Sequence, residues 1–131
     1  MARNPDPSPS PNVGVATWAY NGTDWEAISV DESGRVQVTE AKPSTSAITQ
    51  VASSDSSVLL KAANTDRKGL FISNDSTQSL YVKYGTTASA TDYSVKIASQ
   101  GYYEVPFPVY TGRLDGIWAA ANGYAYVTEL T

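Results

Sequence analysis

Two residue types that proteins use for chemistry are missing from this chain: among its 131 residues there is no cysteine and no histidine. Without cysteine, disulfides and thiolate metal sites are excluded. Without histidine, the chain lacks the usual general base at neutral pH and the commonest metal ligand. No G-x-S-x-G elbow presents a serine nucleophile either. We therefore expect no enzyme activity, no catalytic residue and no cofactor.

The acidic residues offer few alternatives for chemistry. Glu104 and Glu129 stand in predicted strands, but each alternates outward and is expected to meet solvent rather than to form a glycosidase pair. Asp66 and Asp75 lie in predicted turns, where their oxygens could ligate calcium, yet no EF-hand spacing surrounds them. Because Asx residues in turns commonly bond their own backbone, we expect no metal site.

Charge is also sparse in this sequence. Charged residues make up 17% of the chain, and the net charge is −4 with no basic stripe, which argues against nucleic-acid binding through phosphates. No apolar run approaches the ~20 residues of a membrane span, and the N-terminus lacks the apolar core of a signal peptide. We expect the protein to be made in soluble form in a cytoplasm and not to associate with membranes.

What the chain does contain is short apolar stretches separated by turn-forming residues. Hydrophobic residues make up 41%, and many of them alternate with polar residues at period two, which is typical of half-buried strands. The pattern gives about ten strands at the turn-punctuated spacing of an antiparallel β-sandwich or barrel. The predicted fold class is therefore all-β.

Proline and turn residues divide the chain into four predicted segments. Prolines at every second position of residues 1–12 exclude a helix or a central strand there. This segment is either a solvated tail or an extended Pro-rich N-terminal arm that docks on a neighbouring subunit. The remaining segments are a three-stranded β-meander at residues 13–40, a linker at residues 41–46 and a β-sandwich body at residues 47–131.

Local turn chemistry predicts which strands are paired. Asn64–Tyr84 is expected to form a hairpin, with a turn at Asn74–Thr77 between two apolar strands. The Asn-Gly dipeptides at 21–22 and 122–123 are strong hairpin signals. Asp115-Gly116 predicts a further turn. These turns predict that strands which follow one another in the sequence pair with each other in the sheets.

Aromatic and proline residues are the candidates for an interaction surface. Nine tyrosines and three tryptophans are many for so short a chain, and such side chains give large rigid contact areas when exposed. Packing within the sheets is the alternative role for most of them, with the tryptophans as core anchors. An arginine in a turn could pair with an acid on a partner or remain solvated. The candidate interface residues are Pro5, Pro7, Pro9, Pro11, Trp18, Trp25, Arg67, Tyr102, Tyr103, Tyr110 and Trp118.

Several stretches of the chain carry a family resemblance. The segments are NTDRKGLFISNDS at 64–76, LYVKYG at 80–85, GYYE at 101–104, YTGRLDGIWAAANG at 110–123 and VTEL at 127–130. Together they resemble a group of small virion structural proteins of tailed bacteriophages, over residues 64–130. AYNGTDW at 19–25, with DESGRVQV at 31–38, is similar to a meander that recurs in phage structural proteins.

This resemblance implies a structural role in a virion and supplies no catalytic residue. Within that group, the short chain without heptads or fibre repeats favours a capsid decoration, or cement, protein. Such a protein would bind the major capsid protein on the outside of the head, as a homo-oligomer with a trimer favoured, and stabilise the shell against internal DNA pressure. The alternative is a receptor- or glycan-binding module of a head fibre or tail tip.

Overall fold

The computed structural model of the chain describes residues 17–20, 22–28, 32–36 and 41–131. The chain divides into two compact units, Met1–Glu40 and Ala41–Thr131, which we treat separately. The predicted arm at residues 1–12 lies outside the described residues, as do the first residues of the predicted meander. The predicted linker at 41–46 belongs to the second unit, where the backbone of Thr45 already pairs with Thr131.

The first unit contains an antiparallel hairpin of strands β1 (Thr17–Tyr20) and β2 (Trp25–Ile28). Gly22 in its turn has a φ of +99°, a left-handed conformation that glycine adopts readily and other residues rarely do. The hairpin predicted from the first Asn-Gly dipeptide is therefore confirmed. Of the predicted third strand, Val36 forms an isolated bridge, and the residues that follow it lie outside the described part.

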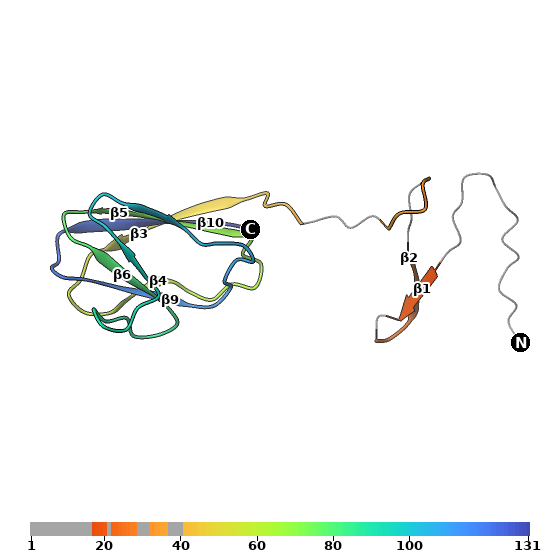
Figure 1. Ribbon diagram of the computed structural model, residues 1–131, viewed down its shortest axis with the longest axis horizontal. Coiled ribbons are helices and arrows are strands. Elements are labelled where there is room, and N and C mark those ends of the chain that lie inside the picture. Colours follow the sequence, from red (N-terminus) through yellow and green to blue (C-terminus); the bar gives the residue numbers. More distant parts are fainter. Residues whose placement is uncertain (1–16, 21, 29–31, 37–40) are drawn as a thin grey trace, which may run out of the picture. The chain divides into compact units, whose positions relative to one another are not determined.

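The second unit is a sandwich of two four-stranded antiparallel sheets (Figure 1). We call the sheet with strand order β3-β10-β5-β8 the β10 sheet, and the sheet with strand order β4-β9-β6-β7 the β9 sheet. The predicted all-β sandwich is confirmed, and every regular element among the described residues is a strand. The strands are β3 (Ser46–Ala52), β4 (Val58–Lys61), β5 (Gly69–Ser76), β6 (Leu80–Tyr84), β7 (Val95–Ile97), β8 (Tyr102–Glu104), β9 (Leu114–Trp118) and β10 (Gly123–Leu130).

The chain winds back and forth between the two sheets. Of the connections between consecutive strands of this unit, the one from β6 to β7 alone joins neighbours within one sheet. Every other connection crosses from one sheet to the other. The two strand orders therefore match position by position: β3 with β4, β10 with β9, β5 with β6 and β8 with β7. This eight-stranded arrangement is that of a jelly roll.

The predicted hairpin at Asn64–Tyr84 is wrong, because β5 and β6 lie in different sheets. Its predicted turn residues belong largely to β5, where Asn74 is fully buried. The Asn74 amide donates to the backbone oxygens of Gln78 at 2.8 Å and Ala98 at 2.9 Å, and its oxygen accepts from Trp118 Nε1 at 3.0 Å. The polar side chain that suggested a turn thus satisfies buried groups where the chain crosses between sheets.

Two further turn predictions are corrected in the same region. The second Asn-Gly dipeptide does not close a hairpin, because β9 and β10 lie in different sheets. Asp115-Gly116 is not a turn but the middle of β9, with both residues buried. A Cβ on Gly116 would stand 2.7 Å from a methyl carbon of Leu60 and 2.9 Å from one of Leu80, so that glycine leaves room for the core side chains of the neighbouring strands β4 and β6.

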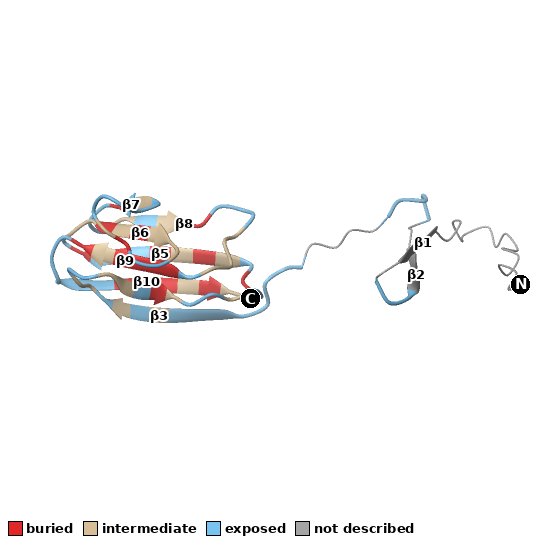
Figure 2. Cartoon of the chain, turned by 90° about the horizontal axis from the view of Figure 1, so that it is seen from below, coloured by how far each residue is buried: buried red, intermediate tan, exposed pale blue. Residues whose placement is uncertain are grey.

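The core between the sheets consists of the inward-facing residues of almost every strand (Figure 2, red). Trp118 is its largest member and is 2% exposed, as expected for a core anchor. Burial of such side chains is the dominant favourable contribution to folding. The core residues are Leu60, Leu70, Ile72, Leu80, Val82, Ile97, Val105, Leu114, Trp118, Ala125 and Val127.

Replacing Asn74 by alanine tests the role of this amide at the crossing connection. We expect Asn74→Ala to lower the free energy of unfolding by about 2–4 kcal/mol, because Trp118 Nε1 and the Ala98 carbonyl lose their partner inside the protein. Its exposed strand neighbour is the control, and Asp75→Ala should change stability by less than about 0.5 kcal/mol. Equal effects of the two substitutions in urea denaturation would contradict the assignment.

Candidate interaction surface

The outer side of the β10 sheet presents a row of large apolar and aromatic side chains. Strand alternation and register place them on one face: Phe71 stands opposite Thr128, and Tyr126 stands opposite Ser73. Tyr102 also stands opposite Ser73, from the other side. We define the aromatic face by its five largest members, which are Ile48, Phe71, Tyr102, Tyr124 and Tyr126.

The aromatic face is open to solvent at both ends. Ile48 on β3 is 70% exposed, Tyr102 on β8 is 62% exposed and Tyr124 on β10 is 43% exposed. The rings of Phe71 and Tyr102 stack with centroids 6.3 Å apart and planes 17° apart. Monomers rarely expose large contiguous apolar patches unless these bind a partner. We infer that this face is the candidate interaction surface.

The aromatic face carries a small negative charge. Among the outward positions of the four strands, Asp75 and Glu104 are acidic and none is basic. The Tyr102 hydroxyl lies 3.4 Å from Glu104 Oε2. Desolvation raises the pKa of Tyr102, and the Glu104 carboxylate raises it further. The hydroxyl therefore stays protonated at neutral pH and is a hydrogen-bond donor beside the acidic Glu104.

The outer side of the β9 sheet differs because the loop at residues 85–94 packs onto it. The backbone N–H of Thr87 donates to Asp115 Oδ2 at 2.9 Å, and that of Ala88 donates to Ser57 Oγ at 2.9 Å. Tyr93 of the same loop contacts Tyr81 edge-on, with ring centroids 4.9 Å apart. The loop thus covers part of this face, on which Leu59 and Tyr93 are 43% and 42% exposed, and the aromatic face carries the more exposed side chains of Ile48 and Tyr102.

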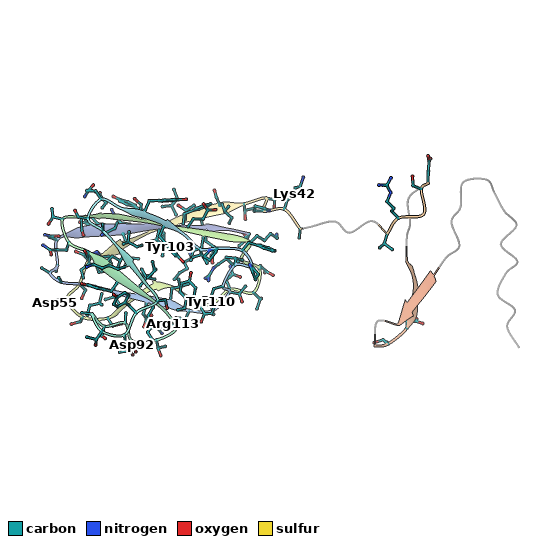
Figure 3. The ribbon with its side chains drawn as sticks, in the orientation of Figure 1. Lys42, Asp55, Asp92, Tyr103, Tyr110 and Arg113 are labelled. Carbon is teal, nitrogen blue, oxygen red and sulfur yellow. The ribbon has the colours of Figure 1, made fainter. Side chains whose placement is uncertain are left out.

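Of the aromatic patch predicted near the prolines, only Tyr102 is exposed. Tyr103 and Tyr110 are half-buried and pack against the core (Figure 3). The Tyr103 hydroxyl is 2.8 Å from that of Tyr84, and the Tyr84 ring stacks on Tyr110 at 4.9 Å. Burial raises the pKa of Tyr84, and the hydrogen bond with Tyr103 raises it further. Both tyrosines are therefore structural.

The tryptophans among the predicted interface residues fall into two groups. Trp118 is in the core and is unavailable to a partner. Trp18 and Trp25 belong to β1 and β2, where Trp18 pairs with Ala27 and Trp25 with Tyr20, but their side chains lie outside the described part. The four arm prolines also lie outside it.

Sequence reasoning missed most of the aromatic face. Phe71 and Ile48 were expected in strands without an assigned surface role, and Tyr124 and Tyr126 were expected in the last strand. The signal was available in the last strand, because alternation sets Tyr126 and Thr128 against the buried Val127. The lateral register that brings Phe71 next to Tyr102 was not available from local sequence.

Arg67 was expected either to meet a partner or to remain solvated, and neither prediction is correct. The residue is 3% exposed, and its Nε donates to Glu129 Oε1 at 2.7 Å. The rest of the guanidinium donates to the backbone oxygens of Tyr110 at 2.8 Å, Gly112 at 2.9 Å and Ala62 at 2.5 Å. Arginine suits this site because its planar group carries five donors.

Glu129 was expected to meet solvent, and this prediction is also wrong. Glu129 faces inward on β10, is 8% exposed, and lies 3.5 Å from Lys61 Nζ as well as beside Arg67. Burial disfavours the ionised carboxylate and tends to raise its pKa. Hydrogen bonds from Arg67 and Asn64, with the charges of Lys61 and Arg67, outweigh burial and lower the pKa of Glu129 below its ordinary value.

No group of metal-binding side chains occurs among the described residues. The same part of the chain contains no helix long and apolar enough to cross a membrane. Comparison with known proteins identifies no family model, no curated protein and no solved structure that matches the chain.

The buried carboxylate of Glu129 predicts a specific loss of stability in acid. Because its folded-state pKa is lowered, Glu129 stabilises the fold above the unfolded-state value of about 4.3, and this contribution disappears as pH falls through the folded-state pKa. Glu129→Gln should lower stability at pH 7 by about 3 kcal/mol and flatten the dependence on pH below 5. Urea denaturation from pH 7 to 3 measures both effects.

The matched control is Glu104→Gln, which removes an exposed carboxylate from β8. We expect this variant to retain the wild-type pH dependence. The role assigned to Glu129 fails if its glutamine variant keeps the full acid sensitivity.

Proposed function

We propose that this chain is a structural protein of a tailed-bacteriophage virion, which decorates the capsid and stabilises it against internal DNA pressure. It is made in the host cytoplasm and acts on the capsid surface, with the major capsid protein as its partner. The observation that carries this proposal is the aromatic face, an open patch of rigid side chains on a stable β-sandwich. The resemblance of residues 64–130 to small phage virion proteins supports the same role.

The fold is compatible with this role by analogy. Jelly rolls occur in viral capsid proteins and in lectins, so that the fold alone does not choose between shell binding and sugar binding. The aromatic face suits a protein partner, since exposed tyrosine and phenylalanine supply the anchors of many protein interfaces. A negatively charged face without bases does not suit DNA or RNA.

Simultaneous binding of several copies would make a modest interface sufficient to hold the protein on the capsid. A decoration protein that forms a homo-oligomer, with a trimer favoured, engages several capsid sites at once, and each added contact becomes an intramolecular event. A face with a few exposed anchors can then hold the protein on the shell even when the affinity of one copy is weak.

Glycan recognition at a fibre or tail tip is the second candidate, and a specific feature of the face favours it. Stacked aromatic rings beside carboxylate and amide groups fit the apolar and hydroxyl surfaces of a sugar ring. Here Phe71 and Tyr102 stack next to Glu104, and Gln50 donates to the Tyr126 hydroxyl at 2.9 Å.

Head binding by face variants tests the decoration role. We expect Tyr102→Ala to weaken binding to purified heads that lack the protein by about tenfold or more, because Tyr102 is an exposed anchor. The matched control is Tyr93→Ala, which removes a tyrosine of 42% exposure from the loop on the opposite face and should bind as the wild type does. If the wild type, Tyr102→Ala and Tyr93→Ala bind equally well, the aromatic face is not part of the capsid interface.

Copy number distinguishes the two candidates. Quantitative mass spectrometry of purified virions should find this chain in numbers comparable to the major capsid protein. A handful of copies per particle, together with a positive glycan-array signal that Tyr102→Ala abolishes, would assign the face to recognition instead.

A further inference from the structure

Strand β3 forms a free edge of the β10 sheet (Figure 2). At one end Thr45 exchanges both backbone hydrogen bonds with Thr131, and at the other the Ser53 N–H donates to the Gly123 oxygen. Because hydrogen-bond direction alternates along a strand, the odd-numbered residues between them face β10. The backbone groups of Ser46, Ile48, Gln50 and Ala52 therefore point away from the sheet, and no described strand pairs with them.

The other three edge strands of the sandwich are protected against strand addition. β7 and β8 have three residues each, and Pro106 follows β8 closely. β4 is interrupted by a register shift between Leu59 and Lys61. β3 has seven residues with no proline, no charge and no irregular register, features that natural proteins usually avoid at a free edge. β3 is thus the edge at which another strand can be added.

The N-terminal arm has a sequence that matches such an edge. Its prolines at positions 5, 7, 9 and 11 alternate strictly with Asp6, Ser8, Ser10 and Asn12. In an extended chain, alternate residues direct their backbone groups to opposite sides. One side of the arm therefore keeps all four N–H groups, while the other side has none, because proline lacks a backbone donor. The four arm residues that keep their backbone N–H groups thus match in number the four residues of β3 whose backbone groups point away from the sheet.

We propose that residues 5–12 of a second copy of this chain add to β3 as an antiparallel fifth strand of the β10 sheet. Directly opposed residues share a face of a sheet. Asp6, Ser8 and Ser10 would then lie on the outer face beside Ile48 and Gln50, with the proline rings on the inner side. The outer edge of the added strand has no donors, so that addition stops after one strand.

We assign the arm to a neighbouring copy, so that each exchange links two chains. Pairing of the arm with β3 of its own chain is the alternative that the crosslinking experiment below distinguishes. The pairing places no like charges opposite each other, because β3 is uncharged and the segment contains only Asp6. This inference goes beyond the proposed function and does not depend on a virion role.

Engineered cysteines test the contact directly, because the natural chain has none. Full-length Ser8→Cys and Gln50→Cys proteins are mixed and treated with a short thiol–thiol crosslinker, which tolerates a shift of one register step. We expect a crosslinked heterodimer in this mixture. A mixture of Ser8→Cys with Lys96→Cys, which places the thiol on an exposed position of edge strand β7, should give none.

Proline substitutions distinguish strand pairing from a loosely attached tail. Ser8→Pro with Ser10→Pro removes two of the four donors from the arm and should weaken self-association by about tenfold or more. Pro7→Ala with Pro9→Ala keeps all four donors and should associate within about twofold of the wild type. On β3, Ile48→Pro removes an outward donor without affecting the bonds to β10, and should give a folded protein that no longer accepts the arm.

Four outcomes would overturn the proposal. They are a monomeric wild type in analytical ultracentrifugation, unchanged self-association of the Ser8→Pro, Ser10→Pro variant, and crosslinks confined to a single chain when both cysteines are on it. The fourth is a Gln50→Cys homodimer that persists when residues 2–12 are deleted, since β3 would then pair with β3. Each result can be obtained whether or not the protein binds a capsid.

Discussion

A buried guanidinium holds together one end of the β-sandwich, and much of the structure depends on it. In a jelly roll most connections cross between sheets, so that backbone oxygens of several loops converge where no sheet ladder can satisfy them. Arg67 donates to the oxygens of Ala62, Tyr110 and Gly112, and its charge is balanced by Glu129 on β10. Apolar residues of equal volume would leave these carbonyls unpaired.

A neutral polar cluster serves the same purpose at a second place. Asn74 links the crossing between β5 and β6 to Trp118 on β9 and to the loop after β7. Between the charged and the neutral cluster the interior is apolar. No buried side-chain nitrogen or oxygen among the described residues lacks a partner, which is the condition for polar groups to be tolerated in a core.

Two features of the unit are the main candidates for contacts with other molecules. One is the aromatic face of the β10 sheet, and the other is the unpaired edge of β3 that borders it. They differ in the kind of contact they make. The face offers side chains to a partner of complementary shape, whereas the edge offers backbone groups that accept another strand.

The sequence by itself determined that the chain is built of short strands and, for most of them, which side is buried, because alternation is a local property. It therefore predicted the all-β fold and the exposure of Tyr102, whereas Trp118 was a candidate for the interface with the core as the alternative. It misplaced the inward-facing Glu129 and the buried strand residues Asp115 and Gly116. Only the tertiary structure decided which strands pair, since turn residues such as Asn74 serve a crossing between sheets as well as a hairpin. The same long-range contacts buried Arg67 with Glu129 and brought Phe71 beside Tyr102, because partners distant in sequence leave no local signal.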